Sequence, residues 1–291
     1  MTDRPGKCLV LGLFLRILSE VKMSRFLTVA THNIMDAISL APLLAAHQRL
    51  RHEHGLHLLC TQENAHASAA AISLSLGWLQ SVAVHPDAPR LSITYDRSVL
   101  ELQQLQCIAL PRLAHVPLWQ RLYTSNRPEQ KHGLLAEFGT AHGRILVANF
   151  HLDAAGENAH RSKQLGALSR AAKAQTRLPL VACGDTNAFS WRRANAEPEL
   201  HKMLASLCST HDALDSHAAH PRDTHFFARA NEPKLGQRIA MAFGRLGIDF
   251  PRRYDVVCSS LPTVASGTIS TPESDHDLVW ATVDPTSMSQ R

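Results

Sequence analysis

The residues in this chain that are equipped for chemistry are an Asp-His pair near its end and an Asp-x-Asn pair further upstream. Asp275-His276 sits just before the last apolar run, and Asp185-x-Asn187 follows the apolar run at 178–183. Metal-assisted phosphoester hydrolysis needs a histidine held by a carboxylate, a carboxylate near an attacking water, and an amide that orients phosphate. The two pairs supply groups of these kinds, but neither means much alone, since Asp185-x-Asn187 also fits a simple Asx turn.

Three more polar groups stand at the ends of earlier apolar runs: Asn33, Glu63 and Asn149-x-His151. Each has a simpler interpretation as a turn cap, a solvated loop residue or an exposed strand edge. Residues two apart in a strand share a face, so Asn149 and His151 are expected to point the same way. An amide beside an imidazole suits a phosphoryl oxygen and a leaving group, and the Glu63 carboxylate suits Mg²⁺. Five polar strand ends at one sheet edge predict a catalytic site more strongly than any one of them alone.

Apolar spacing and turn residues predict that strands and helices alternate loosely along the chain, with antiparallel hairpins between them. This order predicts a mixed α/β domain in which two sheets pack face to face and helices cover the outside. The segment 234–250 has a helical apolar pattern and is interpreted as an outer packing helix or an insertion beside the site. The predicted strands are 26–34, 56–60, 91–96, 102–110, 133–138, 144–151, 178–183, 226–227, 254–258 and 278–283, and the predicted helices are 36–54, 65–76, 160–174 and 197–207.

The composition is that of a globular domain with a sizeable core, since 45% of the 291 residues are hydrophobic and 19% are charged. The net charge of +5 favours a polyanionic partner such as nucleic acid or an anionic lipid surface. The six cysteines form no CxxC, which argues against a zinc site, a redox motif or a disulfide network and favours a reducing cytoplasm. Cys60, Cys183 and Cys258 lie in apolar runs and are expected to be reduced core residues.

The start of the chain carries a short apolar run at 8–18, followed by a second methionine, Met23. The run is too short to span a bilayer and contains an arginine, so we interpret it as part of an extension upstream of the true start. A signal peptide or membrane anchor is the alternative. We expect no stable membrane association, and we divide the chain into an N-terminal extension at 1–22, one catalytic domain at 23–285 and a tail at 286–291.

Taken in order, the strand-end motifs resemble those of the endonuclease/exonuclease/phosphatase superfamily. That family includes pancreatic-type deoxyribonucleases, abasic-site endonucleases, inositol polyphosphate phosphatases and neutral sphingomyelinases. The resemblance spans about residues 26 to 283 and implies a four-layer α/β/β/α sandwich of two mixed β-sheets flanked by helices. The motifs are Thr31-His32-Asn33-Ile34, Gln62-Glu63, Asn149-x-His151-Leu152, Gly184-Asp185-x-Asn187 and Ser274-Asp275-His276, with support from Arg161-x-x-Gln164 and Arg253-Tyr254-Asp255.

The resemblance implies a hydrolase of phosphodiesters that depends on Mg²⁺ or Mn²⁺ and works by in-line attack. Glu63 would be the main metal ligand, helped by Asn33 and Asp275. Asn187 would contact phosphate, and Asn149 would also bind substrate.

The resemblance also implies how protons move. Asp185 would orient or deprotonate the attacking water. His276, held by Asp255, would bind a phosphoryl oxygen or act as the base, and the division of labour between His276 and Asp185 stays open. His151 would stabilise or protonate the leaving group.

The expected activity is that of a nuclease of the endonuclease/exonuclease type, acting as a cytoplasmic monomer on nucleic acid. A sphingomyelinase-like or inositol-phosphate phosphoesterase is the alternative, and a catalytically silent binding protein on the same fold is the alternative from another class. The chain departs from the family pattern at Thr186, where an aromatic residue is common, and at Met35, where many members are polar. His151 stands where a tyrosine would indicate the abasic-site branch.

Overall fold

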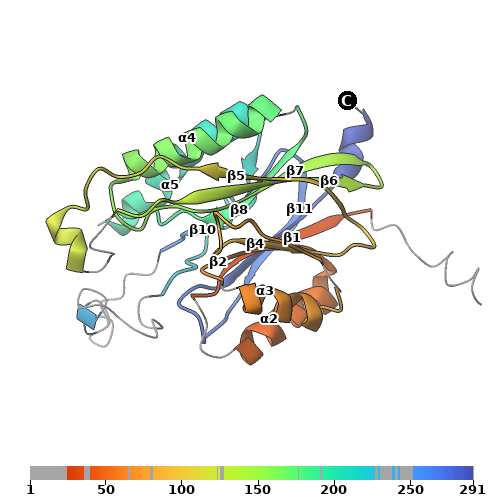
Figure 1. The fold of residues 1–291 in the computed structure, drawn as a ribbon, viewed down its shortest axis with the longest axis horizontal. Coiled ribbons are helices and arrows are strands. Elements are labelled where there is room, and N and C mark those ends of the chain that lie inside the picture. Colours follow the sequence, from red (N-terminus) through yellow and green to blue (C-terminus); the bar gives the residue numbers. More distant parts are fainter. Residues whose placement is uncertain are drawn as a thin grey trace, which may run out of the picture.

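The fold is a sandwich of two six-stranded mixed sheets, covered on both outer faces by helices (Figure 1). The predicted four-layer α/β/β/α architecture is confirmed. The expectations for residues 1–22, and most of those for 234–250, lie outside the described residues. The computed structural model describes residues 25–35, 40–64, 66–78, 81–122, 124, 128–175, 177–190, 192–226, 229, 238–239, 242 and 252–290.

The first sheet has the strand order β11-β12-β1-β2-β4-β3, and helices α2 and α3 cover its outer face (Figure 1). Strand β1 runs parallel to β2 and antiparallel to β12. The bounds are β1 Leu27–Asn33, α2 Leu40–His54, β2 Leu56–Gln62, α3 His66–Ser75, β3 Val82–Ala83, β4 Ser92–Tyr95, β11 Thr263–Ile269 and β12 Leu278–Val283.

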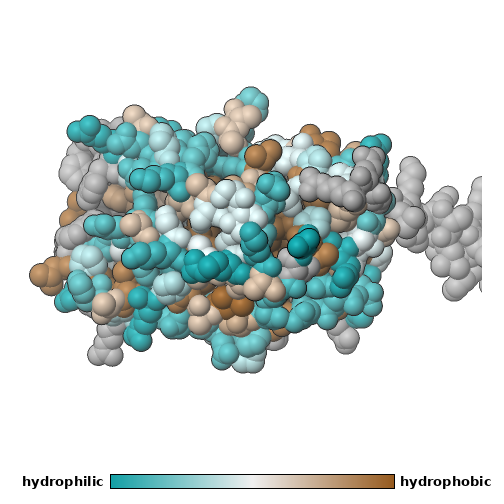
Figure 2. All heavy atoms as spheres, turned by 90° about the horizontal axis from the view of Figure 1, so that it is seen from above, coloured by the Kyte–Doolittle hydropathy of each residue, from teal (hydrophilic) through white to brown (hydrophobic). Residues whose placement is uncertain are grey.

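The second sheet has the order β5-β6-β7-β8-β10-β9, with helices α4 and α5 outside it. Strand β7 runs parallel to β8, and β10 runs antiparallel to β8. Seen from the α4 side, the surface is mostly hydrophilic with scattered apolar side chains, as expected for a solvent-facing layer (Figure 2). The bounds are β5 Glu101–Ala109, η1 Leu118–Leu122, β6 His132–Thr140, β7 Gly143–His151, α4 Asn158–Gln175, β8 Leu180–Asp185, α5 Arg193–His211, β9 Leu214–Asp215, β10 Asp255–Ser259 and η3 Pro285–Gln290.

The continuous apolar run of β8 follows from burial on both of its faces. Val181 and Cys183 pack in the core between the sheets, whereas Leu180 and Ala182 pack beneath α4 and α5. A strand covered on both sides needs apolar residues at every position rather than at alternate ones. Gly184 then allows close approach to β7, since a Cβ at this position would collide with the backbone oxygen of Phe150.

Most predicted elements are present, with ends that differ by a few residues. Strand β11 was not predicted, because its sequence, TVASGTI, is largely small and polar and lacks the apolar pattern of a strand. Its first residues are exposed. The strand expected at 226–227 is wrong for Phe226, which lies in a loop next to an isolated bridge formed by His225; residue 227 lies outside the described part. The expected cysteine state is confirmed, because Cys60, Cys183 and Cys258 are buried free thiols.

The last described residues lie against the sandwich. Residues 285–290, which include most of the expected tail, form η3, and Met288 packs against the core between the sheets. Within the described residues, no helix combines the length and the apolar character needed to cross a bilayer.

Candidate active site

The sheet topology brings the predicted strand ends to one edge of the sandwich. Because β1 and β2 are parallel, Asn33 and Glu63 leave the first sheet at the same edge. In the second sheet, His151 at the end of β7 lies in register with Asp185 at the end of β8. Strand β10 runs the other way, so its first residue, Asp255, also pairs with Asp185.

The residues before β12 complete this edge. Strand β12 is antiparallel to β1, so Asp275 and His276 precede it at the edge where β1 ends. The hydroxyl of Ser274 donates to the backbone oxygen of Asn33 (2.9 Å) and fixes this approach. The two sheets meet here, since the Nδ2 of Asn33 donates to the Oδ2 of Asp185 across 2.9 Å.

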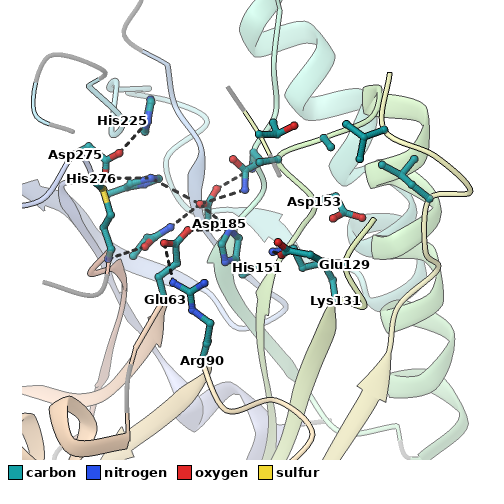
Figure 3. A pocket seen from close by; sticks show the side chains of 18 of the residues that line it. Glu63, Arg90, Glu129, Lys131, His151, Asp153, Asp185, His225, Asp275 and His276 are labelled. Atoms are coloured by element: carbon teal, nitrogen blue, oxygen red, sulfur yellow. Dashed lines mark hydrogen bonds and ion pairs between the residues drawn. The ribbon is translucent and has the colours of Figure 1, made fainter. Parts of the chain in front are cut away.

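A cavity of about 290 Å³ opens at this edge (Figure 3). Seven of the nine predicted site residues line it, and the other two, Asn149 and Asp255, lie behind it. The described residues that line it are Asn33, Met35, Glu63, Arg90, Leu113, Val116, Thr124, Pro128, Glu129, Lys131, His151, Asp153, Ala154, Ala155, Asp185, Asn187, His225, Asp275 and His276.

Asp185 is the centre of the site and is held by donors on both of its oxygens. Its Oδ1 accepts the backbone N–H of Asn187 (2.8 Å), and its Oδ2 accepts the Asn33 amide. Asn187 has a left-handed backbone (φ 47°), which turns its amide back toward Asp185 and the Leu152 carbonyl. Burial raises the pKa of Asp185, with the positive charge of His276 acting against it. Asp185-x-Asn187 is therefore both an Asx turn and part of the site.

His276 is fixed by a buried carboxylate. Its Nδ1 hydrogen-bonds the Oδ2 of Asp255 (2.7 Å), which also accepts the hydroxyl of Thr224 (2.8 Å). The Nε2 of His276 therefore points to the cavity, 3.8 Å from carboxylate oxygens of Asp185 and Asp275. Burial favours the neutral imidazole, but the charges of Asp255, Asp275 and Asp185 outweigh it and raise the pKa of His276 well above its usual value. Asp255 does not reach the cavity and positions His276.

His151 joins the two halves of the site. Its Nε2 lies 3.6 Å from the Oε1 of Glu63 and 3.6 Å from the Oδ2 of Asp185. Burial, followed by the charge of Lys131, lowers the pKa of His151 well below its usual value, so this imidazole is neutral. The surroundings thus shift the pKa values of the two site histidines in opposite directions.

The acidic side chains form an arc with the histidines between them, in the order Glu63, His151, Asp185, His276, Asp275. Neighbours along this arc are 3.6 to 3.8 Å apart. Burial raises the pKa of Glu63, and the charges of Asp185 and Asp275 add to this effect. Burial also acts to raise the pKa of Asp275, but His276 and His225 outweigh it and lower the pKa.

The donor set fits a hard divalent cation. Carboxylate and amide oxygens are the ligands that Mg²⁺ prefers, and four buried or half-buried carboxylates (Glu63, Asp153, Asp185 and Asp275) face one cavity. The Oδ1 of Asp275 is buried and has no hydrogen-bond partner among the described residues. Asn33 uses its oxygen to accept the backbone N–H of Met35 (3.0 Å), which leaves one lone pair for a ligand. The Glu63 carboxylate lies 3.3 Å from the guanidinium of Arg90, so a positively charged group already contacts this candidate metal ligand.

Asn149 is the predicted substrate-binding residue that the structure does not bring to the cavity. It is fully buried between the sheets, where its Nδ2 donates to the carbonyls of Thr61 (3.1 Å) and Ser92 (2.9 Å). Its Oδ1 accepts the Nε2 of Gln62 (2.7 Å). Asn149 and His151 do share a face, but only His151 lies at the rim. The contacts of Asn149 are those of a residue that joins the two sheets.

Helix α4 secures the loop that follows His151. The Oε1 of Gln164 accepts the backbone N–H of Asp153 (3.0 Å), and its Nε2 donates to the Asp153 carboxylate (2.9 Å). Arg161 donates to the carbonyls of Asp153 and Ala154, each across 2.8 Å. The Arg161-x-x-Gln164 pair thus acts as a clamp on this loop.

Sequence reasoning missed several cavity residues. Arg90 comes from the loop before β4, and Lys131 from the segment between β5 and β6 that forms one wall. His225 stacks on Tyr254 at 4.6 Å and lies 3.5 Å from Asp275. No motif marks these residues, because each reaches the site from a loop and not from a strand end.

Known structures share this fold. The chain is similar to D. rerio TDP2 complexed with a single-stranded DNA product, at 15% identity and a TM-score of 0.62, over 88% of this chain and 98% of that one. It is similar to an endonuclease/exonuclease/phosphatase from Bacteroides vulgatus at 16% identity and a TM-score of 0.62, over 89% and 98%. It is also similar to a mannosyl-6-phosphatase from Bacteroides thetaiotaomicron at 15% identity and a TM-score of 0.56, over 88% and 98%. No protein-family model and no curated protein matches the chain.

The chain therefore has the fold of the endonuclease/exonuclease/phosphatase superfamily. The resemblance predicted from the strand-end motifs is confirmed at this level.

Proposed function

We propose that this protein is a metal-dependent phosphoesterase, and that its substrates are phosphodiesters of the nucleic-acid class. The observation that carries the proposal is the arc from Glu63 to Asp275, in which carboxylates and imidazoles alternate around one cavity. A structural cluster of ion pairs has no need to face a cavity, whereas this one lines it. Buried titratable groups with opposite pKa shifts, gathered in a cleft, are typical of catalytic sites.

Glu63, Asp275 and the oxygen of Asn33 would hold the cation, which we propose to be Mg²⁺ or Mn²⁺. When bound, it supplies positive charge that stabilises the phosphate oxygens during in-line attack. The mutual repulsion of the acidic groups would fall at the same time, because the ion offsets the charge that Asp185 and Asp275 impose on Glu63.

The remaining groups divide the proton transfers. Asp185, whose pKa is raised by burial, accepts a proton from the attacking water, while Asn33 and Asn187 keep its oxygens in place. His276, whose pKa is raised by the charges of Asp255, Asp275 and Asp185, is held by Asp255 and binds a phosphoryl oxygen by donating a hydrogen bond from Nε2. This assigns the base to Asp185 rather than to His276.

His151 completes the reaction on the leaving-group side. Because its imidazole is neutral, it stabilises the departing oxygen by donating a hydrogen bond from Nε2 and does not begin as a full proton donor. The bond that forms joins water oxygen to phosphorus, the bond that breaks joins phosphorus to the leaving oxygen, and the leaving oxygen takes its proton from solvent or from the water proton held at Asp185.

Three observations favour nucleic acid as the substrate class. Arg90 and Lys131 place two cations on the wall of the cavity, where a neighbouring phosphate of a polymer would lie, and the chain carries a net charge of +5. D. rerio TDP2, which shares the fold, was crystallised with a single-stranded DNA product. The mannosyl-6-phosphatase with this fold makes sugar phosphates a necessary comparison.

The test is a hydrolysis screen with full-length protein freed of metal by chelation. Single- and double-stranded DNA, RNA, sphingomyelin vesicles, inositol phosphates and mannose 6-phosphate are each assayed without metal and with Mg²⁺ or Mn²⁺. We expect turnover only after metal is restored, and Asp185→Asn or His276→Gln to reduce it by about a hundredfold or more.

The exposed His52→Gln is the matched control and is expected to leave turnover unchanged. Unchanged turnover in folded Asp185→Asn and His276→Gln would contradict the proposal. Absence of any turnover across the screen would favour a binding protein that has kept the fold and lost catalysis.

A further inference from the structure

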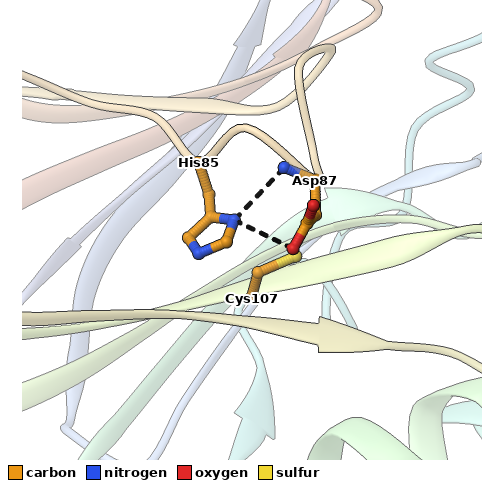
Figure 4. Close-up of side chains that lie close together, drawn as sticks. All are labelled: His85, Asp87 and Cys107. Carbon is orange, nitrogen blue, oxygen red and sulfur yellow. Dashed lines mark hydrogen bonds and ion pairs between the residues drawn. The ribbon is translucent and has the colours of Figure 1, made fainter.

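A second cluster of metal-binding side chains lies outside the active-site cavity. His85 and Asp87 belong to the loop between β3 and β4, and Cys107 lies on β5 (Figure 4). One potential ligand atom from each residue lies within 4.8 Å of the other two. The Nδ1 of His85 is 3.7 Å from the Oδ2 of Asp87. The described residues that line the active-site cavity include none of the three.

The cluster lies where the outermost strand of one sheet comes close to the outermost strand of the other. Strand β3 is the edge of the first sheet and β5 is the edge of the second. Next to Asp87, Ala88 is buried in the core between the sheets, and Cys107 packs against the same core. The cluster is therefore built by tertiary packing rather than by a local turn. The weak hydrogen bond from the Asp87 N–H to the Nδ1 of His85 (3.3 Å) explains that pair, but it does not explain the approach of Cys107.

We propose that His85, Asp87 and Cys107 bind a transition-metal dication of the zinc type and that this ion links the two sheets at the edge of the sandwich. Imidazole, carboxylate and thiolate are the three side-chain ligands that zinc uses. Tetrahedral coordination with bonds of about 2.0 to 2.3 Å places ligand atoms about 3.3 to 3.8 Å apart. The 3.7 Å pair meets this spacing once the Nδ1 of His85 exchanges its weak hydrogen bond from the Asp87 N–H for the metal, and the Asp87 side chain, 73% exposed, is free to adjust the rest.

His132 is the candidate for the fourth position, with water as the alternative. It is opposite Ala109 in the β5–β6 ladder, and Cys107 is opposite Leu134, so His132 and Cys107 are diagonal neighbours on one face.

The charges of the site balance. A dication bound by one carboxylate and one thiolate, with neutral imidazole, is electrically neutral, which suits the margin of an apolar core. Cysteine binds a metal as the thiolate, so the proton of the Cys107 thiol has to leave. Binding forms the sulfur–metal bond and releases one proton to solvent.

Such an ion would also fix the loop that serves the active site. Arg90 lies three residues after Asp87, and Lys131 directly precedes His132. Both line the catalytic cavity. None of its three ligands belongs to the catalytic cavity, so the site would bind metal even if the proposed phosphoesterase activity proved absent.

The experiment is a Co²⁺ titration of the full-length, metal-free protein, followed by competition with Zn²⁺. A thiolate ligand gives a charge-transfer band in the near ultraviolet, which oxygen ligands at Glu63 and Asp275 do not give. We expect one equivalent of Co²⁺ to produce this band, Zn²⁺ to remove it, and Cys107→Ser to abolish it. Circular dichroism confirms that each variant is folded.

Two variants serve as controls. Cys208→Ser removes another partly exposed thiol, and Glu63→Gln alters only the catalytic site, so both are expected to keep the band. Should Cys107→Ser fail to fold, alkylation of the unmodified protein gives the second measurement: Zn²⁺ is expected to protect Cys107 from iodoacetamide more than it protects Cys208. Absence of the band in the unmodified protein, its persistence in Cys107→Ser, or equal labelling of both thiols with Zn²⁺ would overturn the proposal.

Discussion

Replacing Asn149 by alanine separates a structural role from the substrate contact predicted for it. The side chain makes three buried hydrogen bonds, to Thr61, Ser92 and Gln62. A buried hydrogen bond contributes about 1 kcal/mol net, so Asn149→Ala is expected to lower the free energy of unfolding by about 3 kcal/mol. Because the side chain is fully buried and does not reach the cavity, the folded variant is expected to keep KM within about twofold.

Urea unfolding followed by circular dichroism measures the stability, and steady-state kinetics on the best substrate of the screen measures KM and kcat. The matched variant is Asn187→Gly, which removes the same carboxamide from the cavity. Glycine also accepts the left-handed backbone found there (φ 47°). Asn187→Gly is expected to reduce kcat/KM by tenfold or more at a smaller cost in stability. A stable Asn149→Ala protein with a strongly raised KM would refute the structural role of Asn149 and would support the predicted substrate contact instead.

Three further predictions concern the stability of variants at buried residues: a glycine on β8, an arginine just before β10 and a histidine on α2. Gly184→Ala is expected to lower the free energy of unfolding by about 1 to 3 kcal/mol, measured in urea, because its Cβ would collide with the backbone oxygen of Phe150. Arg253→Met is expected to cost about 3 kcal/mol in the same assay, because it leaves the buried Asp215 carboxylate without its guanidinium (2.7 Å). Burial lowers the pKa of His47 well below 6.5, so the unfolded chain takes up a proton as the pH falls through 6.5 while the folded chain does not. Stability is therefore expected to fall toward about pH 5, and thermal unfolding of His47→Gln across pH should show a weaker loss.

The order and chemistry of the site could be read from local sequence. Polar residues that end apolar runs, such as Asp185 after β8 and His151 at the end of β7, mark where a strand leaves the core. Parallel pairing then brings such ends to the same edge of a sheet, so the topology alone predicts that they meet. The four-layer architecture follows from the same alternation of elements.

What the sequence could not supply is the boundary between core and cavity. Asn149 and His151 are two residues apart on one face of β7, yet one joins the sheets and the other meets Glu63. The way the first sheet packs on the second decides which residues of that face of β7 are buried and which reach the cavity. The alternation of polar and apolar residues along the strand does not reveal this. Arg90 and Lys131 were missed for the same reason, since they reach the cavity from loops.

The sequence by itself thus determined most of the strands, the polar groups that end them, and the class of chemistry for which those groups are suited. Only the tertiary structure decided which of them face a common space, how the carboxylate of Asp255 holds His276, and that Cys107 lies close to a histidine and an aspartate of the loop between β3 and β4. The physical reason is that strand formation depends on neighbours along the chain, whereas these contacts depend on how two sheets, far apart in sequence, pack against each other.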